Sequence, residues 1–245
     1  MKITGIIPAR YASTRFPGKP LIDIGGKPMI QRVYEQAMKA GLDKLYVATD
    51  DERIIDCVKN FRGKAVMTSA DHLSGTDRCS EACALLKTDS DIIVNIQGDE
   101  PFIDPEQIRL LTSGFEDRRV QIATLVKKES RETEVANPNT VKVVLDHLGD
   151  AIYFSRSPIP YRRNPMAHIT YYRHIGIYAY SLATLQAITG LPPGKLELAE
   201  SLEQLRWIEA GFKIRTKETE KGSLAIDTPA DLEVVNQMLK KGQLK

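Results

Sequence analysis

Cysteine is scarce in this sequence, which has three in 245 residues. Three cysteines cannot build the disulfide framework that is typical of small secreted proteins. Cys79 and Cys83 are spaced to share one face of a helix, but His72 is the only further metal ligand nearby, and a structural zinc site takes about four ligands. We therefore interpret all three cysteines, Cys57 included, as small buried hydrophobic residues.

The sequence also lacks a long hydrophobic run and a large excess of one charge. No apolar stretch reaches the roughly 18 residues of a membrane span, and the N-terminal residues MKITGIIPARYAS lack the hydrophobic region of a signal peptide. A net charge of +2 provides no broad basic face for nucleic acid. We expect a cytoplasmic protein that binds neither membrane nor nucleic acid and that meets small anionic partners with local clusters of Arg and Lys.

Hydrophobic residues make up 42% of the sequence and charged residues 27%, as in an ordinary globular enzyme. In the first half, short apolar runs alternate with amphipathic stretches, which is the pattern of parallel strands covered by helices on both faces. The expected strands are residues 2–8, 45–49, 64–67 and 92–96. The expected helices are residues 29–38, 52–60 and 76–86, and one from about residue 105. The first half is therefore predicted to be a doubly wound α/β structure.

Beyond Val120 the pattern changes to closely spaced strands, which predicts a mixed sheet or a small protruding subdomain. The expected strands are residues 120–126, 140–146, 151–155 and 174–180. Helices are expected at 196–210 and 229–241, the second of them with Thr228 as its cap and Pro229 in its first turn.

The loop after the first strand is a candidate polyphosphate site, because ligands of open α/β sheets bind beyond the carboxyl ends of the strands. Its residues ARYASTRFPGK include Arg10, Arg15 and Lys19 among small side chains. Arg can fork onto phosphate oxygens, and Lys acts as a point charge. The alternative is a solvated basic loop. The loop matches neither G-x-x-x-x-G-K-[ST] nor G-x-G-x-x-G, so ATPase and NAD dehydrogenase interpretations lose their main support.

Two aspartates are candidate magnesium ligands. Asp99 follows an apolar strand directly, which would hold its carboxylate at the rim of the sheet, where Mg²⁺ takes one or two carboxylates together with phosphates and water. The alternative is a turn aspartate before Pro101. Asp227 precedes a predicted helix, so it is either a ligand or an aspartate that interacts with the helix dipole.

A second basic cluster combines Arg156, Arg162 and Arg163 with Arg173 and His174, and tyrosines are interleaved with it. Cations beside aromatic rings also occur in RNA-binding proteins, but this segment is short and strand-like. Two separate cationic clusters in a nearly neutral chain fit two small anionic substrates better. Surface arginines without a ligand remain the alternative.

With these loops identified, the sequence resembles the CMP-Kdo synthetases, which act on the acidic sugar Kdo (3-deoxy-manno-octulosonate). The motifs that carry the resemblance are, in chain order, IIPARYASTRFPGKPL, ATDDERI, SGTDR, VNIQGDEPFI, NPNTVKVV, YFSRSPIPY, RHIGIYAY, LEQLRWIEAG and IDTPADL. The first is shared with many sugar nucleotidyltransferases, whereas IQGDEP followed by YFSR, RHIGIY and LEQLR is specific. Residues 162–171, RRNPMAHITY, depart from any family pattern, so the roles of Arg162 and Arg163 stay open.

The resemblance implies a Rossmann-like nucleotidyltransferase fold, with a mixed, mostly parallel sheet flanked by helices and a small protruding strand-rich segment. One domain would span residues 1–245, with nucleotide binding mainly in 1–120 and sugar binding and dimerisation mainly in 121–245. The implied protein is a cytoplasmic homodimer that requires Mg²⁺ and converts CTP and Kdo into CMP-Kdo and diphosphate for lipopolysaccharide biosynthesis.

The resemblance also implies roles for individual residues. The implied nucleotide site consists of Pro8, Ala9, Arg10, Arg15, Lys19, Ser74, Gly75, Arg78 and Gln97. The implied sugar site consists of Arg156, His174, Tyr178, Glu203 and Gln204. Asp99 and Asp227 would converge on magnesium. Together with Lys19 and Arg15, which would offset the charge on the departing phosphates, they are the expected catalytic groups.

In the implied reaction the anomeric hydroxyl of Kdo attacks the α-phosphorus of CTP in line, so catalysis is mainly positioning and charge neutralisation. No general base is evident. His174 is the only titrating candidate near the sugar segment, and a metal that acidifies the hydroxyl would make a base unnecessary. Three alternatives stay open: a cytidylyltransferase for 8-amino-Kdo or sialic acid, a non-catalytic nucleotide sensor with the same fold, and a nucleic-acid-binding module.

Overall fold

The computed structural model describes residues 1–12, 16–164, 166–222 and 224–244, and it divides into two compact units. The first unit comprises Met1–Arg109 together with Ser223–Lys245, and the second comprises Leu110–Gly222. The C-terminal segment thus returns to the N-terminal unit. The expected single domain over residues 1–245, divided near residue 120, stays a prediction.

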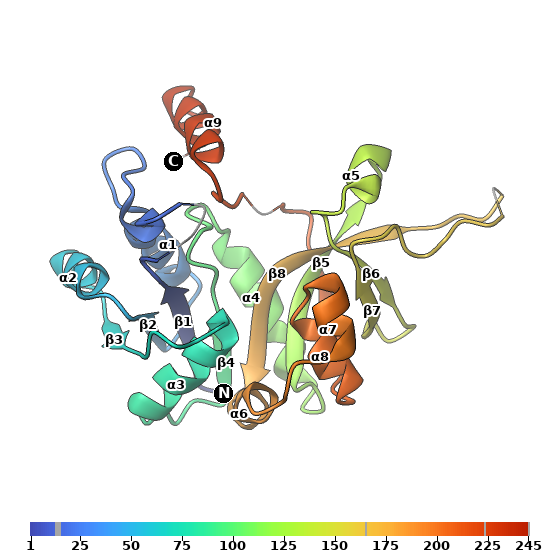
Figure 1. Ribbon diagram of the computed structural model, residues 1–245, viewed down its shortest axis with the longest axis horizontal. Coiled ribbons are helices and arrows are strands. Elements are labelled where there is room, and N and C mark those ends of the chain that lie inside the picture. The colour runs from blue at the N-terminus through green and yellow to red at the C-terminus, as the bar shows by residue number, and fades with distance from the viewer. Residues whose placement is uncertain (13–15, 165, 223, 245) are drawn as a thin grey trace. The chain divides into compact units, whose positions relative to one another are not determined.

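Four parallel strands form the sheet of the first unit (Figure 1). They are β1 (Ile3–Ala9), β2 (Lys44–Thr49), β3 (Ala65–Met67) and β4 (Ile92–Asn95), in the order β3-β2-β1-β4. β1 is central, with Ile6 opposite Tyr46 on β2 and Asn95 on β4. All four residues of β4 are buried, which explains why this strand is a continuous apolar run in the sequence.

The helices of the first unit begin and end close to the predicted positions. They are α1 (Met29–Met38), α2 (Glu52–Asn60), α3 (Gly75–Leu85) and α9 (Pro229–Lys240), with the short 3-10 helix η1 (Lys19–Leu21). Helix α4 (Pro105–Ser113) spans the boundary between the units. Side-chain caps define the starts of three of these helices, because the side chains of Asp51, Ser74 and Thr228 each accept a hydrogen bond from a first-turn amide.

A glycine allows the ends of β1 and β4 to approach each other. A Cβ atom on Gly98 would lie 2.8 Å from the backbone oxygen of Pro8, closer than real Cβ contacts come. Any other residue would push apart the two turns that carry the predicted phosphate loop and Asp99.

The second unit contains a mixed sheet. Its strands are β5 (Ile122–Glu129), β6 (Lys142–Leu145), β7 (Ala151–Ser155), β8 (Tyr171–Ser181) and β9 (Ile214–Glu218). Its helices are α5 (Glu132–Ala136), α6 (Leu182–Thr189), α7 (Lys195–Glu200) and α8 (Gln204–Glu209), with the 3-10 helix η2 (Gly114–Glu116). β5 pairs antiparallel with β8 and parallel with β9, and β6 pairs antiparallel with β7 and β8. The α/β class with a mixed sheet is confirmed.

The sequence predicts one helix over residues 196–210, but the structure has two. Helix α7 ends at Glu200, because the cap residue Ser201 adopts the left-handed conformation with φ of 51°, and α8 begins at Gln204. Leu202 and Leu205 are both buried, so the hydrophobic pattern continues across the break and conceals it. The sequence also did not predict α5, α6 or β9. The last of these, IRTKE, contains a single apolar residue, Ile214, and so lacks the hydrophobic alternation that indicates a strand.

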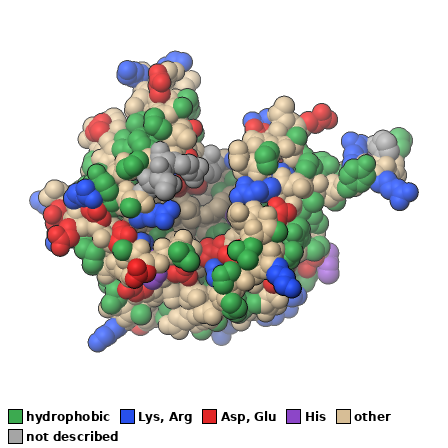
Figure 2. Space-filling model, viewed as in Figure 1, with side chains coloured by type: hydrophobic (Ala, Val, Ile, Leu, Met, Phe, Trp, Pro, Cys, Tyr) green, Lys and Arg blue, Asp and Glu red, His purple; other side chains and the backbone are tan. Residues whose placement is uncertain are grey.

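The connection between β7 and β8, residues 156–170, runs away from the rest of the second unit (Figure 1). Tyr161 and Met166 on it are each 85% exposed, and Arg162 and Arg163 are also exposed. Hydrophobic and cationic side chains gather near its tip (Figure 2). The sequence predicted a strand-rich protrusion, whereas the described residues of this connection form neither strand nor helix.

Burial of the cysteines is largely as predicted. Cys79 and Cys83 are buried on α3, and burial raises the pKa of the Cys83 thiol to about 12. Cys57 is only half-buried, which also raises its pKa. Among the described residues, none of the helices combines the length and the apolar character that a membrane crossing needs.

The cap of α9 leads to a prediction about stability. The Thr228 hydroxyl accepts a hydrogen bond from the Asp231 amide at 3.3 Å and donates to the Asp231 carboxylate at 2.8 Å. We expect Thr228→Ala to lower the free energy of unfolding by about 1 kcal/mol, whereas Thr228→Ser should retain most of it. Urea denaturation measures both. Equal stability of the Ala and wild-type proteins would show that this cap does not stabilise α9.

Candidate active site

A cavity of about 260 Å³ lies in the first unit, where the loops after β1 and β4 meet the start of α3. It is lined by eight of the nine residues predicted to bind the nucleotide, namely Pro8, Ala9, Arg10, Lys19, Ser74, Gly75, Arg78 and Gln97. Asp99 and Asp227 line it as well. Arg15, the ninth, lies outside the described residues. The structure thus brings together residues that the sequence spreads over more than 200 positions.

Lys19 lies between the two predicted metal ligands. Its ammonium group is 2.8 Å from Asp99 Oδ2 and 3.0 Å from Asp227 Oδ1, and its side chain is only 13% exposed. Lys19 begins η1 directly after Gly18, whose φ of 70° turns the chain back from the preceding loop. The turn therefore places the ammonium group at the carboxyl end of β4.

The backbone and the cap of α9 hold the two aspartates in place. The amide of Ile226 donates to the backbone oxygen of Asp99 at 3.0 Å, which joins the segment before α9 to the turn after β4. The Asp227 amide donates to the carboxylate of Asp231 at 3.0 Å. Hydrogen bonds from the Thr228 side chain and from backbone amides outweigh burial and lower the pKa of Asp231, so it stays ionised.

The geometry of Asp99 and Asp227 fits a magnesium ion. One oxygen of each carboxylate is within hydrogen-bond distance of the same ammonium nitrogen, so both carboxylates point to one cation position. Magnesium prefers hard oxygen ligands and is usually bound by one or two carboxylates plus phosphate oxygens and water. No cluster of three or more His, Cys, Asp or Glu ligands occurs in the described part of the chain. The remaining ligands would therefore come from the nucleotide and water.

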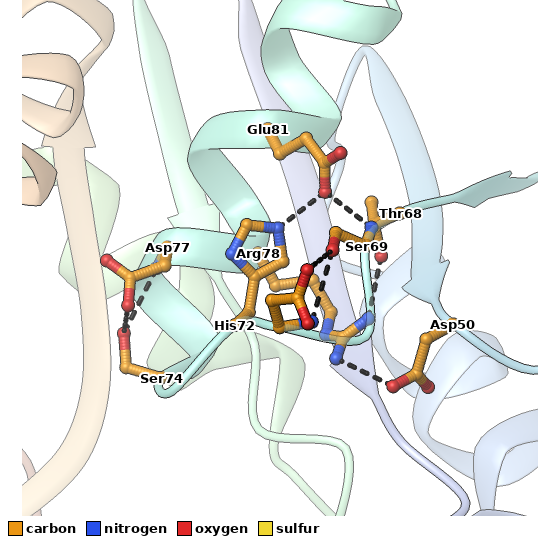
Figure 3. A network of polar contacts seen from close by, with 9 residues as sticks. Asp50, Thr68, Ser69, His72, Ser74, Asp77, Arg78 and Glu81 are labelled. Carbon is orange, nitrogen blue, oxygen red and sulfur yellow. Dashed lines mark hydrogen bonds and ion pairs between the residues drawn. The ribbon is translucent and has the colours of Figure 1, made fainter.

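Arg78 fixes the wall of the cavity at the start of α3 (Figure 3). It is 3% exposed, and its guanidinium group donates to Thr68 Oγ1 at 2.7 Å and to Asp50 Oδ2 at 3.2 Å. Asp50 follows β2 and Thr68 follows β3, so Arg78 ties the carboxyl ends of two strands to α3. In this structure Arg78 acts by positioning the cavity wall, and a contact between Arg78 and the nucleotide stays a prediction.

His72 lines the same cavity, although the sequence singled it out only as an insufficient zinc ligand. Its Nε2 atom lies 2.5 Å from Glu81 Oε2, which also accepts the Ser69 amide at 2.8 Å (Figure 3). Burial opposes ionisation of Glu81, but these hydrogen bonds outweigh it and hold its pKa below the usual value. Pro20, Leu73 and Gly98 are further lining residues that the sequence did not predict. Leu73 and His72 directly precede the SGTDR motif, which was the available signal.

The residues predicted to bind the sugar all belong to the second unit. His174 and Tyr178 lie on β8, Arg156 follows β7, and Glu203 and Gln204 lie at the start of α8. The His174 and Tyr178 rings are 5.3 Å apart between centroids. Phe154 packs edge-on against His174 at 5.1 Å, and Trp207 packs edge-on against Tyr178, also at 5.1 Å. An aromatic cluster therefore holds the two residues of β8.

Arg156 uses its guanidinium group on the protein itself. It donates to the backbone oxygens of Glu200 at 2.7 Å, Pro138 at 3.0 Å and Ser201 at 3.3 Å. Its backbone amide donates to the Glu200 carboxylate at 2.9 Å. These bonds fix the turn between α7 and α8, directly before Glu203. Sugar binding by Arg156 itself stays a prediction, and the observed contacts make it a positioning residue for the turn.

A buried lysine holds the backbone of Arg156 against the loop after α5. Lys142 is 1% exposed, and its ammonium group donates to the backbone oxygens of Asn137 at 2.9 Å, Thr140 at 2.6 Å and Arg156. Burial lowers the pKa of Lys142, because water no longer stabilises its charge. Three backbone carbonyls take the place of water around the ammonium group. Through them Lys142 connects the loop after α5 with the loop after β7.

His174 is poorly suited to act as a general base. Burial lowers its pKa to about 3, so the imidazole is neutral throughout the physiological range and has little affinity for a proton. Burial also raises the pKa of Tyr178 well above its usual value. Both side chains therefore offer neutral hydrogen-bonding groups, and the low pKa of His174 disfavours it as the base considered from the sequence.

Comparison with known proteins identifies the family. The family model described as cytidylyltransferase matches residues 4–216. A 3-deoxy-manno-octulosonate cytidylyltransferase of Bacteroides thetaiotaomicron is 56% identical, and the match covers 98% of this chain and 99% of that protein. A relative with the same name from Parabacteroides distasonis is 57% identical, over 95% of this chain and 96% of that one.

A solved structure of CMP:2-keto-3-deoxy-manno-octonic acid synthetase complexed with CTP superimposes on the chain with a TM-score of 0.93. It is 49% identical, and the match covers 99% of this chain and all of that one. The fold expected from the sequence is thereby confirmed. Full-length identity of this degree, together with the matching fold, shows that the chain belongs to the 3-deoxy-manno-octulosonate cytidylyltransferase family.

Proposed function

We propose that the protein catalyses the reaction of CTP with Kdo to give CMP-Kdo and diphosphate, in lipopolysaccharide biosynthesis. The observation that carries this proposal is the convergence of Lys19, Asp99 and Asp227 in one cavity with the loop after β1. This arrangement combines a cation for phosphate oxygens with two carboxylates for a metal ion. These groups suit the transfer of a cytidylyl group, which is the reaction that the names of the relatives describe.

The residues of the first unit bind and orient the nucleotide. Arg10 and Lys19 would contact the phosphates, and Lys19 offsets the charge that develops on diphosphate as the bond between the α- and β-phosphates breaks. Arg15 would share this role. Lys19 is paired with the two carboxylates here, so it would leave them for the phosphates when a divalent ion takes its place between Asp99 and Asp227.

Magnesium is part of this proposal, with Asp99 and Asp227 as its protein ligands. When bound, it would neutralise phosphate charge and lower the pKa of the anomeric hydroxyl that attacks the α-phosphorus. The two aspartates hold the position for a cation. Since neither Tyr178 nor His174 is a suitable base, the hydroxyl proton would leave to solvent rather than to a side chain of the aromatic cluster.

The sugar site is proposed in the second unit, at His174, Tyr178, Glu203 and Gln204, with Arg156 fixing the turn that carries the last two. Gln204 is 5% exposed, and its Nε2 atom has no hydrogen-bond partner among the described residues. A buried amide without a partner is costly, so it fits a ligand oxygen.

The choice of substrates gives the direct test of this function. We expect rapid release of pyrophosphate from CTP with Kdo, and much slower release with 8-amino-Kdo or sialic acid. UTP should be poorer than CTP by orders of magnitude, since a pocket that hydrogen-bonds the exocyclic amine rejects an analogue without it. A coupled pyrophosphate assay with each pair measures this. Equal rates with CTP and UTP, or a faster reaction with sialic acid, would overturn the assignment.

The metal site is tested by charge-neutral substitutions. Asp99→Asn and Asp227→Asn should each lower turnover about 100-fold or more at physiological Mg²⁺, because the amide keeps the shape but loses the charge that holds a hard cation. Higher Mg²⁺ or Mn²⁺ should restore part of the activity. The double variant should lower turnover little more than either single variant does, because both residues act on one ion.

The matched control is Asp56→Asn, which removes an exposed carboxylate of α2, 3.9 Å from Lys59. It should leave turnover and metal dependence unchanged. Multiplicative losses in the double variant that do not respond to added metal would show that Asp99 and Asp227 do not share an ion.

We further propose that the protein is a cytoplasmic homodimer. The projecting segment 156–170 supports a partner, because Tyr161 and Met166 are each 85% exposed there. Light scattering should give twice the mass of one chain. The variant carrying Tyr161→Ser and Met166→Ser should shift toward the monomer, whereas Leu73→Ser, which changes an exposed residue of the nucleotide cavity, should not. A monomeric wild-type protein would contradict the proposal.

A further inference from the structure

The pairing of β5 with β8 contains an irregularity next to His174. Thr124 of β5 lies opposite Tyr178, but its neighbour Leu125 lies opposite Ile175, so the register shifts between them. Two residues of β8, Gly176 and Ile177, bulge out of the ladder at this point. Thr124 is completely buried beneath the bulge.

The bulge turns two backbone carbonyls toward the Thr124 hydroxyl. Its Oγ1 atom is 2.8 Å from the oxygen of Ile177 and 3.3 Å from the oxygen of Ile175. The same Oγ1 atom is 3.0 Å from Nε2 of His174. One hydroxyl group therefore links the distorted strand to the imidazole ring.

The direction of these hydrogen bonds determines the tautomer of His174. A hydroxyl has one proton, and a carbonyl oxygen can only accept. If Thr124 gave its proton to the imidazole, a lone pair of its oxygen would face the Ile177 oxygen at 2.8 Å without a proton between them. The hydroxyl therefore donates to the carbonyl and accepts from Nε2–H of His174. The neutral ring then has no proton on Nδ1.

Two aromatic rings pack against the imidazole ring of His174. Phe154 covers one side of His174 edge-on, and Tyr178 lies on another, with centroid distances of 5.1 Å and 5.3 Å. After burial, the negative charge of Glu203 raises the pKa of Tyr178, whereas a hydrogen-bonding contact with Thr124 lowers it. A hydroxyl oxygen has two lone pairs, so this contact leaves the hydrogen bond from Nε2–H of His174 in place. Thr124 is thus the residue that orders the protons on His174.

We propose that Thr124 is a positioning residue that holds His174 as the Nε2–H tautomer, so that Nδ1 accepts a hydrogen bond from a hydroxyl group of the acceptor sugar. This inference rests on the proposed function, which puts the sugar at His174. A neutral acceptor nitrogen suits a hydroxyl donor and gives no attraction to the sugar carboxylate. His174 therefore selects the hydroxyl face of the sugar, and cationic groups elsewhere are left for the carboxylate.

The first arm of the test is spectroscopic and needs no sugar. Long-range ¹H–¹⁵N spectra of the imidazole groups in the wild-type protein should show His174 as the neutral Nε2–H tautomer at neutral pH and still neutral at pH 5. Thr124→Val removes the hydroxyl at nearly constant shape and should give mixed tautomers. Thr124→Ser keeps the hydroxyl and should restore the single tautomer.

The second arm measures kinetics. Thr124→Val should raise the KM for Kdo roughly 3- to 10-fold, the value of one neutral hydrogen bond, with little change in the KM for CTP. Thr124→Ser should restore the KM for Kdo. A purely structural role would instead lower stability and affect both substrates together, which urea denaturation of the same variants would reveal.

A wild-type spectrum with His174 protonated on Nδ1, or charged at pH 7, would overturn the proposal even if Thr124→Val does not fold. Equal KM values for Kdo in the Val and Ser variants would also overturn it. If the wild-type protein shows the expected tautomer but does not turn over Kdo, the proposed function and the sugar contact both fail. That result differs from failure of the tautomer assignment itself.

Discussion

Two carboxylates from distant parts of the chain have to share one cation, and the nucleotide cavity is arranged around this constraint. Asp99 and Asp227 would repel each other without a positive group between them, and Lys19 supplies it at 2.8 Å and 3.0 Å. The turn after β4, the start of α9 and η1 are therefore held at one point. Gly98 allows the close approach of β4 to β1 that this geometry needs.

The positive charge of an arginine in the sequence did not show whether its guanidinium group binds a ligand or the protein itself. Arg78 and Arg156 both belong to motifs of the family, yet each donates to groups of the protein. Arg78 joins the strand ends that form the wall of the nucleotide cavity, and Arg156 joins the turn that carries Glu203. The guanidinium group of Arg78 is buried and needs such partners, because an unpaired charge is costly to remove from water, whereas that of Arg156 is only partly buried. Both sites are thus supported by cations that are fixed before any substrate binds.

Much of the first unit was predictable, because buried parallel strands such as β4 leave continuous apolar runs and polar turns mark their ends. The convergence of Lys19, Asp99 and Asp227 was predicted from the family resemblance, since nothing in the local pattern relates residues so far apart. The break at Ser201 was missed because no glycine or proline marks it. The role of Thr124 depends on a bulge whose position is set by strand pairing, and pairing does not appear in a hydrophobic pattern.

We propose above that Asp99 and Asp227 bind one divalent ion together with the nucleotide. Crystals grown with CTP and Mn²⁺ test it most directly, because manganese replaces magnesium on oxygen ligands and gives an anomalous signal. We expect a manganese peak that contacts both carboxylates and a phosphate oxygen, with Lys19 moved onto the phosphates. Manganese bound away from both aspartates, with the ion pairs of Lys19 intact beside bound CTP, would contradict it.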